Sequence, residues 1–153
     1  MRTVVAEMKK KSERISRIVA VSKTEERSQC QEMGRAQKKL DDEVDRLGEL
    51  KAYRHSYQRQ FQPGGDVSSA RWQDYQNFMR RLDQAVLAQQ EQVLTGRQNR
   101  DAHRQRWMVK KQKLESLERI VDRYRRSEDV ELERQLQKTL DDLPAKTDIY
   151  EQD

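Results

Sequence analysis

Few side chains in this sequence have the types and spacing that catalysis or metal binding needs. The two histidines, His55 and His103, are far apart, and neither has another histidine or a cysteine at the spacing of metal ligands. We expect His103 to pack opposite Glu26 rather than to act as a general base. The single cysteine, Cys30, has no partner for an internal disulfide, and we expect it to be a small residue on a helix flank.

Phosphate binding and acid–base catalysis have no better support. Gly64-Gly65 is too short for a phosphate-binding loop and is not followed by the Lys-Ser/Thr pair of such loops. The many carboxylates belong on solvated helix faces, because two helices alone enclose no apolar pocket that would shift their pKa values. We therefore predict that the protein is not an enzyme and uses no cofactor or metal.

Aromatic side chains offer binding chemistry instead. Of the nine aromatic residues, six lie between positions 53 and 78. Exposed aromatic side chains in a row, with an arginine beside them, are typical anchors for a protein partner. The six are Tyr53, Tyr57, Phe61, Trp72, Tyr75 and Phe78.

Basic side chains gather in two segments that are distant in the sequence. Such a surface attracts phosphate groups, but the acidic residues among them and the lack of stacking aromatic residues argue against nucleic acid. An acidic protein surface attracts the same charges. The basic residues are Lys9, Lys10, Lys11, Arg14 and Arg17 in the first segment, and Lys110, Lys111, Lys113, Arg119, Arg123, Arg125 and Arg126 in the second.

Long helices must position these side chains. The chain of 153 residues is 33% hydrophobic and 39% charged, with a net charge of +5, which is too polar for a thick core and too balanced in charge for disorder. No run of apolar residues is long enough for a membrane span or a signal peptide, so we expect a reducing, cytoplasmic location without membrane insertion.

Two heptad patterns flank one turn signal, Pro63-Gly64-Gly65-Asp66. Apolar residues recur at a and d positions from Val5 to Phe61 and from Trp72 to Tyr124, which indicates an all-α, antiparallel two-helix coiled coil, a helical hairpin. We assign residues 1–61 to the first helix, 62–68 to the hinge with Ser68 or Ser69 as helix cap, and 69–126 to the second helix. Residues 127–153 form an acidic extension, for which we expect a short helix and then disorder.

The residue types favour one register, in which the numbers of facing residues add up to 129. It sets Met33 against Gly96 and Glu26 against His103, and a slip by one heptad would set Arg100 against an apolar partner. In this register Arg46, Tyr53, Phe78 and Ala85 occupy g positions and form one exposed stripe, edged by Leu50, Tyr57 and Leu82. The alternative is that Tyr53 and Phe78 fold over the seam and thicken a thin core.

The residues around the hinge resemble the flagellar FliJ family. The resemblance rests on Tyr53-Arg54-His55-Ser56-Tyr57 before the hinge and Arg71-Trp72-Gln73-Asp74-Tyr75-Gln76-Asn77-Phe78 after it, and the hairpin layout matches over roughly residues 1–140. It implies a cytoplasmic component of the flagellar type III export apparatus, peripheral on the inner membrane. The family's partners are the hexameric export ATPase (FliI), the transmembrane export gate protein (FlhA) and export chaperones.

The resemblance also assigns residues to these contacts. The gate contact of the family, carried over by motif, falls on Leu50, Tyr53, Tyr57, Phe78, Leu82 and Ala85, together with two positions that depart from the family's usual residues, Arg46 and Gln89. We place the contact with the ATPase ring at the basic open end of the hairpin, on Lys9, Lys10, Lys11, Arg14, Arg119 and Arg123, and expect the free chain to be a monomer.

Two other functions compete with this one. The equivalent stalk of a virulence injectisome has the same architecture, although the Arg-Trp-x-x-Tyr-x-x-Phe block favours the flagellar system. A generic coiled-coil scaffold or a nucleic-acid-binding hairpin is the second, and a gel shift at physiological salt separates nucleic acid from protein partners.

Overall fold

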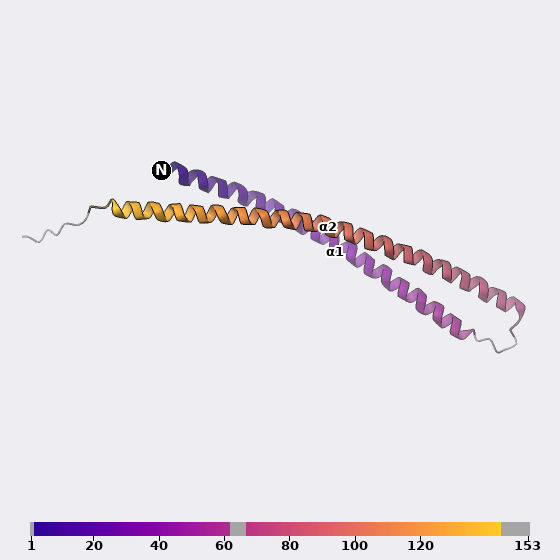
Figure 1. The fold of residues 1–153 in the computed structure, drawn as a ribbon. Helices are drawn as coiled ribbons and strands as arrows, with labels where there is room; N and C mark the ends of the chain where they lie inside the picture. Colours follow the sequence, from indigo (N-terminus) through magenta and orange to yellow (C-terminus); the bar gives the residue numbers. More distant parts are fainter. Residues whose placement is uncertain (1, 62–66, 145–153) are drawn as a thin grey trace, which may run out of the picture. The chain divides into compact units, whose positions relative to one another are not determined.

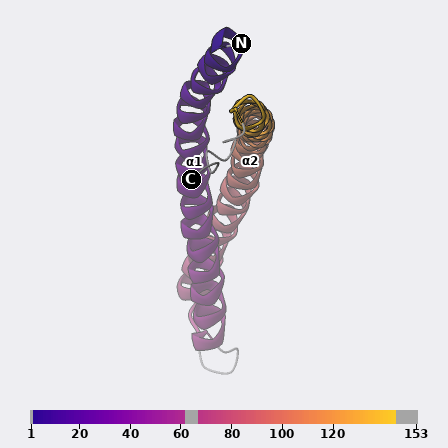
Figure 2. The ribbon, with the colours of Figure 1, turned by 90° about the vertical axis from the view of Figure 1, so that its left-hand side faces the viewer.

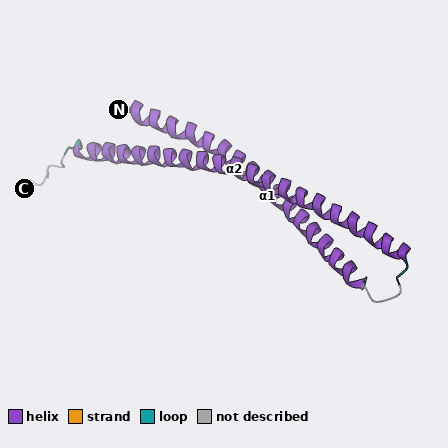
Figure 3. Cartoon of the chain, turned by 45° about the vertical axis from the view of Figure 1, so that its right-hand side comes forward, coloured by secondary structure: helices purple, strands orange, loops and turns teal. Residues whose placement is uncertain are grey.

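The described part of the chain consists of two long α-helices. The computed structural model describes residues 2–61 and 67–144, without the side chains of 2–5 and 8–10. Within these ranges, α1 spans Arg2–Gln60 and α2 spans Ser69–Asp141 (Figures 1 and 3). The few other described residues lie next to the helix ends and are not helical. The two helices pack together as the predicted helical hairpin.

The hairpin divides into two compact units. One comprises Glu26–Lys110 and is called here the hinge unit; the other comprises Met1–Glu25 with Lys111–Asp153 and is called the terminal unit. In each unit a segment of α1 packs on a segment of α2 that runs in the opposite direction (Figure 2). Neither helix, within the described residues, contains a stretch apolar enough to cross a bilayer.

The start of α2 follows the predicted capping chemistry. The backbone N–H of Arg71 donates to Oγ of Ser68 at 3.4 Å, and the N–H of Trp72 donates to the carbonyl of Ser68 at 3.1 Å. The Ser68 side chain therefore satisfies one of the N–H groups that a helix leaves unpaired in its first turn, and its carbonyl accepts the first regular bond of α2.

The short helix expected after residue 127 is a direct continuation of α2. Ser127 Oγ donates to the Arg123 carbonyl at 3.0 Å, the bond of a serine inside a helix, and α2 continues to Asp141. The change to acidic composition at 127 is thus a change in surface charge and not an element boundary. The expectation of disorder falls on residues 145–153, which lie outside the described residues.

Burial confirms the heptad positions. Every buried side chain in the described part of the chain occupies a predicted a or d position, and none of the large ones is completely buried. A two-helix seam covers only one stripe of each helix, which explains why 33% hydrophobic residues suffice. The buried residues are Ser12, Val19, Ser22, Ala36, Leu40, Met79, Leu82, Val86, Val93 and Val121.

The predicted register is wrong by one heptad. A Cβ placed on Gly96 would lie 3.7 Å from Cα of Leu40, so Gly96 faces Leu40 and not Met33. At the hinge end, the rings of Phe61 and Tyr75 stack with centroids 4.1 Å apart. The numbers of facing residues in the hinge unit therefore add up to 136 rather than 129.

Small residues and adaptable polar side chains explain why this register is tolerated. It sets Arg100 against Ala36, whose methyl group leaves room for the guanidinium to reach Oε1 of Gln37 at 3.5 Å and Asp101 at 2.9 Å. Across another layer, Nε2 of Gln89 donates to the carbonyl of Glu43 at 2.9 Å. An apolar residue opposite Arg100 was expected to impose a desolvation cost on the guanidinium. This cost is avoided because the charged end of Arg100 leaves the seam.

Candidate partner-binding surfaces

Six aromatic rings next to the hinge form one continuous cluster, called here the hinge aromatic cluster: Tyr53, Tyr57, Phe61, Trp72, Tyr75 and Phe78. At its centre, Tyr57 contacts Phe78 with ring centroids 4.4 Å apart and Tyr75 with centroids 5.6 Å apart. Phe61 and Trp72, with centroids 5.8 Å apart, complete the cluster toward the hinge. Such pairs add roughly 0.5–1.5 kcal/mol each beyond area burial, so the cluster holds the two helix ends together.

The two g-position rings differ in exposure. Phe78 is half-buried because it folds over the seam onto Tyr57, which is the alternative that the sequence left open. Tyr53 remains 55% exposed and meets Phe78 edge-on with centroids 6.2 Å apart. Trp72, expected in the seam, is 45% exposed. The exposed aromatic surface therefore consists of Tyr53 and Trp72, with the edge of Phe78 between the helices.

The remaining residues assigned to the gate contact lie beside Tyr53 or beneath it. Arg46 and Tyr53, both exposed, line a shallow hollow of about 320 Å³ with Glu49, Leu50 and Gln89. Three others are less accessible: Tyr57 and Ala85 are half-buried, and Leu82 is buried in the seam. The structure thus brings Arg46, Leu50, Tyr53 and Gln89 together on the surface and places Leu82 under it as packing.

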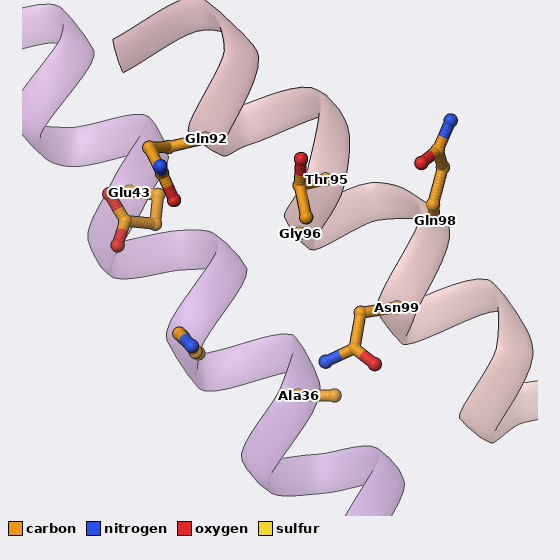
Figure 4. A pocket seen from close by; sticks show the side chains of 8 residues that line it. Ala36, Glu43, Gln92, Thr95, Gly96, Gln98 and Asn99 are labelled. Carbon is orange, nitrogen blue, oxygen red and sulfur yellow. The ribbon is translucent and has the colours of Figure 1, made fainter. Parts of the chain in front are cut away.

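A second hollow lies over the glycine of α2. Ala36 and Gly96 bring little or no side chain to it, and Lys39, Glu43 and Asn99 are among its polar walls, which enclose about 310 Å³. Figure 4 shows Asn99 directed toward α1 beside Ala36. The hollow was not predictable from the heptad pattern, because its walls depend on which residues of α1 lie level with Gly96.

The polar seam of the hinge unit pairs residues differently from the prediction. Nε1 of Trp107 donates to Oε1 of Glu26 at 2.7 Å, whereas Nδ1 of His103 lies 3.8 Å from Oε2 of Glu32. His103 therefore lies in the seam as expected, but its acidic neighbour is Glu32 and not Glu26. Within the described residues, no group of three or more metal-binding side chains comes together.

The terminal unit carries the predicted basic surface in part. Lys11, Arg14, Arg119 and Arg123 are all exposed, so their charges face solvent. The side chains of Lys9 and Lys10 lie outside the described residues. Acidic residues share this surface: Glu13 is exposed as well, and Glu118 and Asp122 line a hollow with Lys23 and Arg125. The arrangement suits an ionic contact with a protein surface of mixed charge and an acidic excess.

The family profile of the flagellar FliJ protein matches residues 10–147, which is most of the chain. The chain belongs to the FliJ family. A comparison with curated proteins finds no match. Membership in the FliJ family makes this chain a component of flagellar type III export, and the family is associated with export rather than with enzymatic activity. The residues around the hinge that suggested the resemblance lie inside the matched range.

Proposed function

We propose that this FliJ-family chain is a cytoplasmic rod that connects the hexameric export ATPase to the transmembrane export gate. The exposed surface of Tyr53, Arg46, Leu50 and Gln89 contacts the gate, and the basic surface of the terminal unit lies inside the ATPase ring. ATP hydrolysis belongs to the ring, and this chain supplies a mechanical link. The protein works as a monomer on the cytoplasmic face of the inner membrane and also binds export chaperones.

The exposure of Tyr53 is the observation that carries the proposal. A tyrosine that is 55% exposed, next to a hollow with an arginine, is rarely needed for folding and is typical of an interface anchor. The Tyr53 ring already packs against Tyr57 and Phe78, with centroids 6.5 Å and 6.2 Å apart, so less side-chain entropy is lost when a partner binds.

A pull-down with the cytoplasmic domain of the gate tests this surface. Tyr53→Ala is expected to weaken binding about tenfold or more, while Leu87→Ala, at another exposed position of the hinge unit, leaves it unchanged. Circular dichroism checks that both variants remain helical. Undiminished gate binding by a fully helical Tyr53→Ala protein would remove the proposed surface.

ATPase stimulation tests the basic end. Reversing Lys11, Arg14, Arg119 and Arg123 to Glu is expected to weaken stimulation of the export ATPase, and the loss shrinks at high salt because exposed charges are screened. The matched control reverses four exposed basic residues near the hinge, Lys51, Arg59, Arg71 and Arg80. Equal stimulation by both sets at low salt would exclude a basic contact with the ring.

The virulence injectisome stalk remains the second candidate, because it shares the hairpin. The match to the flagellar FliJ profile favours the flagellar system. Genes neighbouring this one decide between the two: flagellar structural genes support the proposal, and injectisome needle genes contradict it.

A further inference from the structure

Near the C-terminal end of α2, the apolar residues no longer occupy the a and d positions. As far as Tyr124, the a and d positions that face α1 are mainly apolar. After Tyr124 the next four a and d positions are polar, and leucines occur at other heptad positions instead. The polar seam residues are Glu128, Glu131, Gln135 and Lys138, and the displaced leucines are Leu132, Leu136, Leu140 and Leu143. This end of α2 therefore does not use its apolar residues to pack on α1.

The displaced leucines form one exposed stripe, called here the leucine stripe (toward the yellow end of α2 in Figure 1). Leu132 is 46% exposed, and Leu136, Leu140 and Leu143 are 59%, 62% and 60% exposed. The spacing of four residues places Leu132, Leu136 and Leu140 on one side of α2, and Leu143 follows the end of the helix with its N–H donating to the Leu140 carbonyl at 3.3 Å. Isolated exposed leucines such as Leu87 and Leu94 are ordinary, but four in succession mark a docking surface.

Acidic side chains surround the leucine stripe. Residues 128–142 contain six Asp/Glu and two Lys/Arg, a net charge of −4 in a chain whose total is +5. Anionic lipid headgroups and nucleic acids are repelled by this charge. A polypeptide with basic residues beside its own apolar positions is attracted by it.

We propose that the leucine stripe is the docking site for an amphipathic helix of another protein that carries Lys or Arg on both sides of its apolar positions. A helix fits because leucines at this spacing present the knobs that a facing helix receives in its holes. The acidic rim selects the basic partner and speeds its approach. This contact uses other residues than those proposed for the gate and the ATPase ring, and it does not rest on those two proposals.

A synthetic peptide probe tests the site with the full-length protein. The probe is a dye-labelled helix with Leu at the a and d positions and Lys at the e and g positions, and the control peptide has Glu in place of each Lys. Fluorescence anisotropy is expected to show binding of the basic peptide and at least tenfold weaker binding of the acidic one. Tight binding of the acidic peptide would overturn the charge argument.

Two pairs of substitutions locate the binding. Leu136→Glu with Leu140→Glu is expected to weaken binding of the basic peptide at least tenfold, and the protein still folds because both side chains are exposed. Leu87→Glu with Leu94→Glu, at equally exposed leucines of the hinge unit, leaves binding unchanged. If both pairs of substitutions weaken binding of the basic peptide equally, or if neither pair weakens it, the leucine stripe is not the docking site.

Charge neutralisation and two further measurements complete the test. Asp129→Asn with Glu133→Gln, both at exposed positions, is expected to weaken binding and to flatten its salt dependence. Sedimentation of the free protein is expected to be independent of concentration, and vesicles of anionic lipid are expected not to retain it. Self-association or vesicle binding that Leu136→Glu with Leu140→Glu abolishes would mean a different occupant and would overturn the proposal.

Discussion

Gly96 of α2 packs directly against Leu40 of α1. A Cβ at position 96 would approach Cδ1 of Leu40 to 3.3 Å and Cα of Leu40 to 3.7 Å, so α2 packs here on Leu40 with no side chain of its own between them. Leu40 is only 4% exposed, since it lies over the glycine. This contact and the stacking of Phe61 on Tyr75 both fit the register in which the numbers of facing residues add up to 136.

Spin labels distinguish the observed register from the one expected from residue types. The observed register sets residue 99 level with residue 37 and residue 85 level with residue 51. Labels at Lys39 and Asn99 are then offset by about 3 Å along the helices, and labels at Lys39 and Ala85 by about 18 Å. Pulsed electron paramagnetic resonance in a Cys30→Ser background measures both distances, and the first pair of labels is expected to be the closer one. The opposite order would restore the register whose facing numbers add up to 129.

Glycine substitutions report the close approach through stability. A Cβ at Gly34 or Gly48 meets no atom within 4 Å, so Gly34→Ala and Gly48→Ala are each expected to stabilise the hairpin by about 0.5–1 kcal/mol through helix propensity. Gly96→Ala gains the same propensity but pushes on buried Leu40, and is expected to gain nothing or to destabilise. Thermal unfolding followed by circular dichroism compares the three. A rise in melting temperature for Gly96→Ala equal to that of Gly48→Ala would contradict the contact.

Substitutions of the two g-position aromatic residues are expected to change the free energy of unfolding by different amounts. Phe78 is half-buried on Tyr57, so Phe78→Ala is predicted to cost about 1–3 kcal/mol of unfolding free energy. Tyr53 is mainly exposed, and Tyr53→Ala is predicted to cost less than about 1 kcal/mol. Urea unfolding of both variants measures the difference. Equal costs would mean that Tyr53 is packed as tightly as Phe78 and is a poorer candidate for a partner anchor.

Heptad spacing was sufficient to predict the two helices and their inward faces, but not their alignment. Any shift by seven residues keeps every a and d position in the seam, so the sequence pattern alone is degenerate. The choice between registers came down to side-chain size and polarity, and both registers set Gly96 against a large side chain, Met33 or Leu40. The preference for polar layers failed because Arg100 extends out of the seam to Gln37 and needs no polar residue opposite it.

The candidate surfaces were predictable to different degrees. The g positions of Tyr53 and Phe78 are independent of the register, but a g position alone does not decide exposure, because Tyr53 is 55% exposed and Phe78 is half-buried. Phe78 is covered because the ring of α1 that it meets is Tyr57. The hollow over Gly96 could be predicted only with the correct register of α1 and α2. The leucine stripe was not predictable as a surface, because its exposure follows from the continuation of α2 as one helix to Asp141.

A double-mutant cycle at Glu26 tests the polar seam. The indole of Trp107 donates to Glu26 at 2.7 Å, and both side chains are half-buried, so Glu26→Ala is expected to cost about 1–2 kcal/mol. In a Trp107→Phe background the same substitution is expected to cost much less, giving a coupling of about 1 kcal/mol. A cycle with His103→Ala is the matched control and is expected to show little coupling, because His103 lies beside Glu32. Strong coupling of Glu26 to His103 and none to Trp107 would mean that the seam pairs as the sequence alone suggested.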